Sequence, residues 1–312
     1  MKRVGIACAG VAGASAIGLV AKDEGRDQPP PSRRTGQVRA FDTGLDVDQG
    51  LVVVASGGPA EATRKVIEEL GGIASFVKLD DKVVIKPNIG WDRTPIQAAN
   101  TNPIVVATLV EMCLGAGAAE VIVTDHSCNE ARRCFTRSGI WRAAEDAGAQ
   151  IVLPAPHRFR SYDLGGVILG RMPVLAAAVQ ADRFINVPVA KHHGLSGFTG
   201  AMKNLYGVLG GRRNRLHQRI DDSIADLADF IRPTLTVMDA TRVLVRNGPV
   251  GGDVADTEEI GKIIASVDQV TVDAYSCSLI GLEPPALPYL GLGGERGLGQ
   301  PDLSRLDVKE VT

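Results

Sequence analysis

The sequence predicts an α/β fold, with a mainly parallel sheet and helices on both faces, built as one large domain. The main observation is that short runs rich in Val and Ile alternate with helix-like segments from Leu51 onward, the order of repeated βαβ units. The composition agrees, because 45% hydrophobic and 22% charged residues are an ordinary globular balance. With 312 residues, the chain is long enough to bury a substantial core.

Local patterns define the individual elements. The second predicted helix follows Asn102, a residue type that caps helix N-termini, and Pro103. Residues 158–169 have the pattern of a hairpin. Residues 283–299 are rich in Pro and Gly, which predicts irregular chain with short helical turns. Strands are predicted at residues 51–56, 82–86, 120–124, 150–153, 183–189, 235–239 and 261–266, and helices at 59–70, 104–114, 131–147, 223–231 and 270–280.

Residues 1–21 precede this domain and have the layout of a signal peptide. Lys2 and Arg3 come before an uncharged apolar run, residues 4–21, which ends in small residues. The same run is long enough for an uncleaved membrane anchor, and a buried glycine-rich strand is a third interpretation. Residues 22–50 contain a run of prolines and little periodicity, as in a linker. We therefore expect an α/β domain at residues 51–312, located outside the cytoplasm and, in the second interpretation, anchored through residues 4–21.

Charge and motif content argue against several classes of protein. A net charge of −2 and 4% aromatic residues do not favour nucleic-acid binding. The P-loop, the G-x-S-x-G elbow and the H-E-x-x-H motif are all missing from the sequence. The five cysteines form no C-x-x-C pair, which argues against an iron–sulfur cluster. The sequence identifies no other cofactor. Cys128 and Cys134 allow a disulfide if the protein is exported.

The candidate site is predicted where several strands end in polar residues. The apolar run at residues 183–189 leads into a Gly-flanked loop with Lys191, His192 and His193, and Lys203 with Asn204 follows about ten residues later. In doubly wound sheets, ligands bind outside the carboxyl ends of the strands. The other strand ends supply Lys86 with Asn88, Asp125 with His126, and Asp239.

These residue types suit an anionic ligand. Lys86, Lys191 and Lys203 are expected to bind negative charge, and the amides of Asn88 and Asn204 to orient the ligand. His193, Asp125 and Lys191 are the candidates for acid–base catalysis, and Asp239 is a further ligand-binding candidate.

Each assignment has a plain alternative. A lysine that follows a strand is often only a solvated end, and an Asp there often caps a helix. Neighbouring side chains on an extended segment point to opposite sides, so one of His192 and His193 is expected in the site. A metal held by histidine and carboxylates is conceivable, and so is a purely structural histidine, but we assign no metal ligand. The basic cluster at residues 210–219 is either a solvated loop or a lid over an anion.

The motifs resemble the bacterial and archaeal family called domain of unknown function 362. The resemblance spans residues 80–305, with His193 at the position of the family's histidine and His192 as a departure. It implies no general activity. Many members carry ferredoxin-type cysteines and many look exported, and this chain lacks those cysteines. The matching residues are Val84 to Asn88, Asn102-Pro103, Asp182 to Lys191, Thr199 to Gly207, Asp239, Asn247 to Pro249, Ala265 to Asp268, and Asp273.

The leading hypothesis is an enzyme or enzyme-like protein that acts on an anionic small molecule in a cleft of Lys, Asn, His and Asp. The first alternative is an extracytoplasmic binding protein without catalysis. The second is a redox protein that depends on a metal or cofactor. Substrate and reaction do not follow from the sequence.

Overall fold

The computed structural model describes residues 39–40 and 50–312. The predicted signal peptide or anchor (1–21) and nearly all of the predicted linker (22–50) lie outside the described residues. Within the described ranges, no helix is both long enough and apolar enough to cross a membrane.

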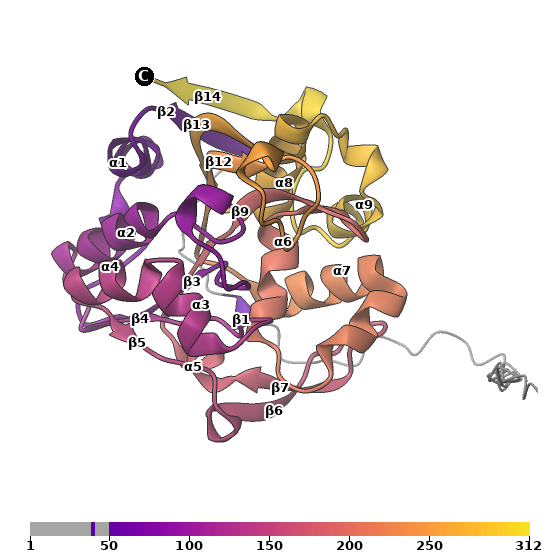
Figure 1. The fold of residues 1–312 in the computed structure, drawn as a ribbon, viewed down its shortest axis with the longest axis horizontal. Coiled ribbons are helices and arrows are strands. Elements are labelled where there is room, and N and C mark those ends of the chain that lie inside the picture. Colours follow the sequence, from indigo (N-terminus) through magenta and orange to yellow (C-terminus); the bar gives the residue numbers. More distant parts are fainter. Residues whose placement is uncertain (1–38, 41–49) are drawn as a thin grey trace, which may run out of the picture. The chain divides into compact units, whose positions relative to one another are not determined.

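A central sheet organises the domain, and most of its neighbouring strands are parallel (Figure 1). The five strands from β12 to β5 run parallel to one another, whereas β13 runs antiparallel to both β12 and β2. The order is β14 (Asp307–Val311), β2 (Leu51–Ser56), β13 (Thr257–Ser266), β12 (Leu235–Leu244), β8 (Arg183–Val187), β3 (Lys82–Pro87), β4 (Glu120–Val123) and β5 (Gln150–Ile151).

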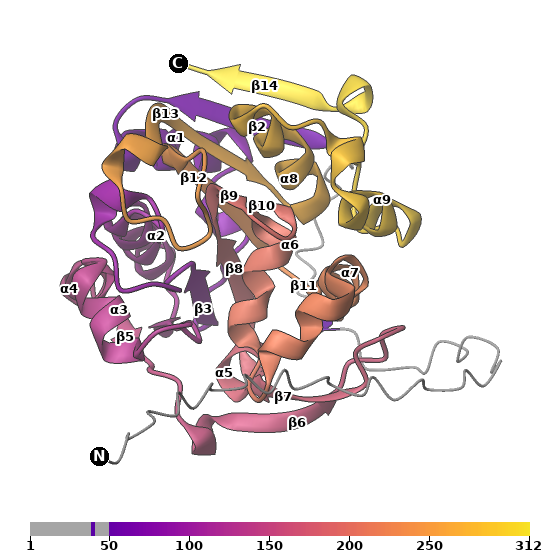
Figure 2. The ribbon, with the colours of Figure 1, turned by 45° about the vertical axis from the view of Figure 1, so that its right-hand side comes forward.

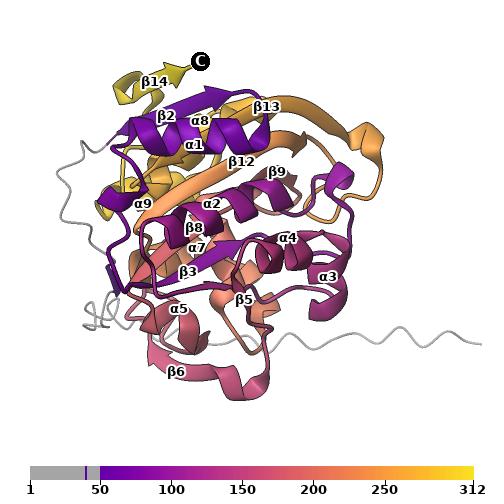
Figure 3. The ribbon, with the colours of Figure 1, turned by 90° about the vertical axis from the view of Figure 1, so that its left-hand side faces the viewer.

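Helices cover both faces of this sheet, as predicted. Figure 3 shows α1, α2 and α4 in front of the strands, and Figure 2 shows α6, α7 and α8 on the other side. The first layer comprises α1 (Pro59–Glu69), α2 (Pro103–Gly115), α3 (Ala131–Arg137) and α4 (Ile140–Asp146). The second comprises α5 (Ala176–Gln180), α6 (Ala201–Asn204), α7 (Ile220–Phe230), α8 (Gln269–Cys277) and α9 (Pro288–Glu295).

The two helix layers bury separate hydrophobic cores because side chains alternate along each strand. Val52 and Val54 of β2 pack into the core with α6 to α9, whereas Val53 and Ala55 pack into the core with α1 and α2. A strand buried on both faces must be apolar at every position, which explains the unbroken Val and Ile runs of the sequence.

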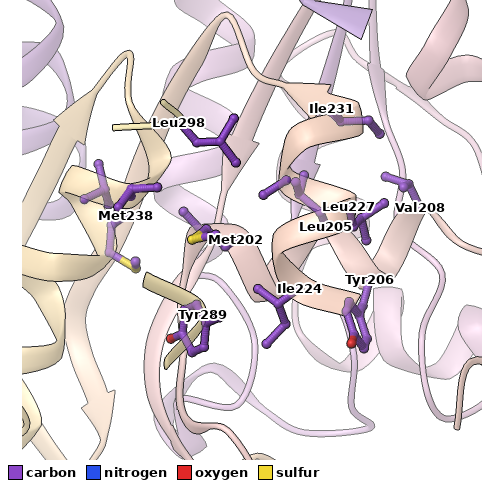
Figure 4. Close-up of a cluster of buried hydrophobic side chains, with 14 of the residues drawn as sticks. Met202, Leu205, Tyr206, Val208, Ile224, Leu227, Ile231, Met238, Tyr289 and Leu298 are labelled. Carbon is purple, nitrogen blue, oxygen red and sulfur yellow. The ribbon is translucent and has the colours of Figure 1, made fainter. Parts of the chain in front are cut away.

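The second core holds α6 in place (Figure 4). Met202 and Leu205 from the α6 region lie among Ile224 and Leu227 of α7, and all four are fully buried. Burying each such side chain contributes roughly 1.5–3 kcal/mol. The core therefore anchors the short helix that carries two of the predicted site residues.

Two predicted elements differ from those observed. The predicted helix at 131–147 is two helices, because Gly139 has a left-handed φ of 77° between them. The predicted strand at 183–189 ends before Pro188. Lys191 to His193 do not lie in a loop but in strand β9 (Val189–His193), which pairs with β10 (Gly197–Thr199) and β12.

Other predicted elements are confirmed, with shifted ends. The hairpin forms from β6 (Phe159–Asp163) and β7 (Arg171–Leu175), and β12 and β13 are longer than expected. Outside the central sheet, β1 (Arg39–Ala40) pairs with β11 (Ile231–Arg232).

Candidate functional site

A cavity of about 590 Å³ opens where β3 and β4 end and beside the hairpin that β9 forms with β10. Its wall also includes α6, the 3₁₀ segments Leu205–Val208 and Arg213–Arg219, and Gly248 with Pro249. Among the predicted site residues, those that line it are Asn88, Asp125, Lys191, His193, Lys203 and Asn204. The expected convergence of strand ends therefore occurs, with two exceptions described below.

Lys86 is the first exception, because it lies beneath the cavity instead of lining it. Its ammonium Nζ is 2.8 Å from Asp125 Oδ1, and both side chains are almost fully buried. The same Nζ donates to the Pro87 carbonyl at 2.9 Å and to Asn204 Oδ1 at 3.0 Å. Three acceptors occupy the three hydrogens of a lysine. Lys86 therefore supports the site from below.

Asp125 is held as the counter-ion of this lysine. Its Oδ2 accepts a hydrogen bond from Ile89 N at 2.7 Å, and Oδ1 accepts one from His126 N at 3.0 Å. Burial lowers the pKa of Lys86, and the charge of Asp125 opposes that effect. These contacts fix the position of the Asp125 carboxylate at the cavity wall.

Three asparagines connect this ion pair to the cavity. Asn204 Nδ2 donates to Asn186 Oδ1 at 2.8 Å, and Asn88 Nδ2 donates to Asn204 Oδ1 at 3.0 Å. Asn186 in turn donates to the carbonyl of Ala201 at 2.8 Å, which ties β8 to α6. Buried polar groups that are all paired rigidify a site, and here they fix the amides that we expected to orient a ligand.

Lys191 reaches the cavity from β9 and has no carboxylate partner among the described residues. Its Nζ donates to the Ala99 carbonyl at 2.5 Å and to Asn88 Oδ1 at 3.1 Å. Burial, together with the nearby charge of Lys203, lowers its pKa to about 7. A buried ammonium without a counter-ion is destabilised relative to its neutral form. Lys191 therefore changes protonation near neutral pH.

Lys203 enters the cavity from α6 and is less tethered. Its Nζ lies 3.8 Å from the centre of the Tyr206 ring, and no hydrogen-bond acceptor contacts it within the described part of the chain. Burial, together with the charge of Arg213, lowers its pKa to about 8. Asp273 orients the helix, because its carboxylate accepts from the backbone N of Ala201 at 2.5 Å and of Met202 at 3.0 Å.

His193 faces the cavity, while its neighbour His192 is not among the lining residues. His193 Nδ1 accepts from the backbone N of Leu195 at 3.1 Å and of Ser196 at 3.2 Å, so the neutral ring carries its proton on Nε2. Burial, with Lys203 and Lys191, lowers its pKa to about 3. His193 is therefore a neutral donor. His192 Nδ1 accepts from Gly248 N at 3.2 Å and holds that loop.

Arg213 from the basic cluster is a further cation on the wall. It donates to the carbonyls of His126 at 2.7 Å and Ser127 at 3.0 Å, and no carboxylate of the described residues pairs with it. The sequence indicated the cluster but not which arginine reaches the cavity. His217 of the same cluster also lines the wall, as do Trp91 and Tyr206, which were not predicted as site residues.

Gly207 shows how tightly the chain packs against the ion pair of Lys86 and Asp125. A Cβ atom at this position would overlap Asp125 Oδ1 and would lie 2.6 Å from Lys86 Nζ. The backbone of Gly207 also accepts from His126 N at 2.8 Å. Only glycine lets the chain pass this close to the ion pair.

Asp239 is the second exception, because it lies away from the cavity. Its carboxylate accepts from Asn102 N at 2.7 Å and from the hydroxyl of Thr241 at 2.7 Å. It borders a smaller hollow of about 200 Å³ beside the start of α2. These contacts join β12 to the start of α2.

Residues 50–312 contain no disulfide and no cluster of metal-ligating side chains. Cys128, exposed at the cavity, and the buried Cys134 are both free thiols. Within the described ranges, no three His, Cys, Asp or Glu side chains are grouped so that they could hold a metal ion.

Charge is the property that distinguishes the cavity. Lys191, Lys203 and Arg213 line it, and the one carboxylate on the described wall, Asp125, is already paired with Lys86. The uncompensated charge is therefore positive, which raises the local concentration of anions.

The fold and the site together define an α/β protein with a cationic cavity at the strand ends. Residues 83–278 match the family described as "Domain of unknown function (DUF362)", and the chain belongs to that family. The resemblance inferred from the motifs is thereby confirmed.

Two further comparisons were found. A thylakoid-associated protein of Synechocystis sp. is 26% identical over 251 residues, which cover 78% of this chain and 76% of that protein. The structure of the lactate racemase apoprotein from Thermoanaerobacterium thermosaccharolyticum aligns with a TM-score of 0.43 at 14% identity. That alignment covers 73% of this chain and 56% of the racemase chain.

Proposed function

We propose that the protein binds an anionic small molecule in this cavity and acts on it as an enzyme. The observation that carries the proposal is the pair Lys191 and Lys203, which are buried at the cavity without a carboxylate partner among the described residues. Burying an unpaired charge is costly, and a bound anion removes that cost. Arg213 and the Nε2 proton of His193 supply further donors.

The cavity suits a molecule with an apolar part as well as a charge. Trp91, Leu195 and Pro249 belong to the wall that also carries the lysines. A volume of about 590 Å³ lies in the range of sites that hold small organic ligands. We therefore infer an organic acid or phosphate ester in preference to a bare inorganic ion.

Lys191 is the candidate for proton transfer. A group with a pKa of about 7 can both accept and release a proton at neutral pH, as a general acid–base catalyst requires. His193 and Asp125, which the sequence also suggested, serve in this proposal as a neutral donor and as the counter-ion of Lys86.

A non-catalytic binding protein is the second candidate. It is favoured by the ion pair that already engages Asp125 and by the lowered pKa of His193, which keeps that ring neutral. Conversion of the identified ligand by the purified protein, lost in Lys191→Met, would support the enzyme. Stable binding of unaltered ligand would support the binding protein.

The direct test is mass spectrometry of small molecules released from purified, denatured protein. An acidic compound at about one per chain, absent from Lys203→Met, is the expected result. Wild-type protein without any bound acid, together with no measurable affinity across a library of organic acids and phosphate esters, would end the proposal.

We also propose that the chain functions outside the cytoplasm, exported or anchored through residues 4–21. The support is the signal-like pattern of residues 1–21. The relative's name refers to thylakoid association, which is compatible with a role at a membrane. N-terminal sequencing of the native protein tests the cleaved form, and a soluble cytoplasmic chain that retains Met1 would contradict the proposal.

A further inference from the structure

The two cavity lysines differ in how they are held, and this difference indicates separate roles. Lys191 Nζ has two oxygen acceptors, the Ala99 carbonyl and Asn88 Oδ1. Lys203 Nζ has no acceptor among the described residues and rests on the face of Tyr206. The two acceptors hold the Lys191 amine in one orientation, whereas the untethered amine of Lys203, once neutral, can turn its lone pair toward a ligand.

The position of Lys203 is nevertheless fixed. Asp273 caps the start of α6, and Met202 and Leu205 on either side of the lysine are fully buried. The backbone thus presents the side chain to the cavity while its amine stays free. Reactive groups need this combination of a rigid support and an unengaged end.

We propose that Lys203 forms a Schiff base with the carbonyl group of an organic oxo acid. The charge of that acid is bound by Lys191 and Arg213, both of which line the same cavity. This inference rests on the proposed anion site and names its substrate class. Desolvation among apolar groups and neighbouring cations is the usual way in which a lysine becomes a nucleophile.

The neutral Nζ of Lys203 attacks the carbonyl carbon, so that a C–N bond forms and the C=O π electrons move to oxygen. The oxygen leaves as water with one hydrogen from the amine and one added proton. The product is a protonated imine, C=N⁺H, on Lys203. The lowered pKa of Lys203, about 8, makes the neutral amine accessible near neutral pH.

The alternative is that Lys203 only binds charge. The Tyr206 ring favours the cationic form of the lysine through its quadrupole, and an ammonium at this position would contact an anion without any covalent step. Arginine at position 203 keeps the charge but is not a nucleophile, so the two roles separate in Lys203→Arg.

The experiment is reductive trapping of the full chain with phenylpyruvate or pyruvate and sodium borohydride, followed by intact-mass measurement and peptide mapping. We expect one reduced adduct per chain, located on Lys203, and at least a tenfold loss of adduct in Lys203→Arg. Lys65→Arg, at a partly exposed lysine paired with Glu61 outside the cavity, is the matched control and should trap like wild type.

Other outcomes overturn the inference. Adducts spread over surface lysines, or no adduct with either acid, exclude a reactive Lys203, and the wild-type peptide map decides this even if the variant does not fold. Calorimetric binding of the same acids is measured in parallel. Binding without trapping refutes the Schiff base but preserves the anion site, whereas no binding of these acids or of any other organic acid or phosphate ester refutes both.

Discussion

A buried lysine lies beneath the cavity and others line its wall. The charge of the lower one, Lys86, is compensated by Asp125, whereas the charge of Lys203 on the wall is not. Below, Lys86 meets a carboxylate, a carbonyl and an amide oxygen. Above, Lys203 meets no oxygen acceptor in the described part of the chain. Both side chains are buried, so burial alone does not identify a functional lysine.

The comparison shows that charge balance is the useful criterion. A buried ion pair whose remaining hydrogens are satisfied is a structural unit, and removing one partner leaves a costly unpaired charge. A buried cation without a counter-ion is costly already, and a ligand can supply the missing charge. Five predictions test this distinction.

The largest effect is expected for Lys86→Met. The substitution leaves Asp125 buried without its counter-ion, so the free energy of unfolding should fall by about 3–5 kcal/mol. Urea denaturation measures it. Lys65→Met at the exposed pair with Glu61 is the control and should change stability by about 0.5 kcal/mol or less. A similarly small effect at Lys86 would mean that the pair is not a structural unit.

Gly207→Ala should disrupt the same layer by overpacking. The added methyl group overlaps Asp125 and crowds Lys86, which should cost about 1–3 kcal/mol of unfolding free energy. Gly115→Ala at the end of α2 is the matched control, because nothing lies within 4 Å of its added Cβ. That control should be neutral or stabilising. Equal effects at the two glycines would contradict the close packing of Gly207 against Asp125 and Lys86.

Lys203→Met should lower the affinity for the ligand without lowering the stability of the protein, in contrast to Lys86→Met. Affinity for the co-purifying acid should fall by about 2 kcal/mol, as for a charge-assisted hydrogen bond. Stability without ligand should stay the same or rise, because an uncompensated buried charge is removed. Calorimetry and urea denaturation provide the two readings, with Lys309→Met at the surface pair with Glu69 as control. A loss of stability with unchanged affinity would mean that Lys203, like Lys86, stabilises the fold and does not bind the ligand.

The pH dependence of the free energy of unfolding should reveal the uncompensated positive charge of Lys191 and Lys203. An unfolded lysine has a pKa of about 10.4, whereas Lys191 and Lys203 have pKa values of about 7 and about 8 in the folded protein. The unfolded state therefore binds more protons from about pH 7 to about pH 10, so the free energy of unfolding should rise with pH in that window. Below about pH 7 the destabilisation is fully present.

Lys203→Met tests this linkage. It should remove on the order of 1 kcal/mol of the rise between about pH 7 and pH 9. Urea denaturation at several pH values is the measurement. An identical rise in wild type and variant would mean that other groups cause it.

The smallest effect on affinity is expected for Asp239→Asn. Asp239 lies outside the cavity, so binding of the acid should change by about 0.5 kcal/mol or less. Calorimetry on the variant provides the check. A loss as large as that of Lys203→Met would return Asp239 to the site in which the sequence suggested it.

The sequence alone determined the class of fold and the neighbourhood of the site. Unbroken runs of Val and Ile are typical of strands that are buried on both faces between two helix layers. The carboxyl ends of parallel strands meet at one edge of such a sheet. Six of the eight predicted site residues consequently line one cavity, namely Asn88, Asp125, Lys191, His193, Lys203 and Asn204.

Tertiary structure alone decided the roles within that neighbourhood. Lys86 and Lys203 look alike in the sequence, each close to an asparagine. They differ because Asp125, brought beside Lys86 by β4, compensates one charge and leaves the other open. The state of a titratable group depends on distances to groups remote in sequence, and local patterns do not encode those distances.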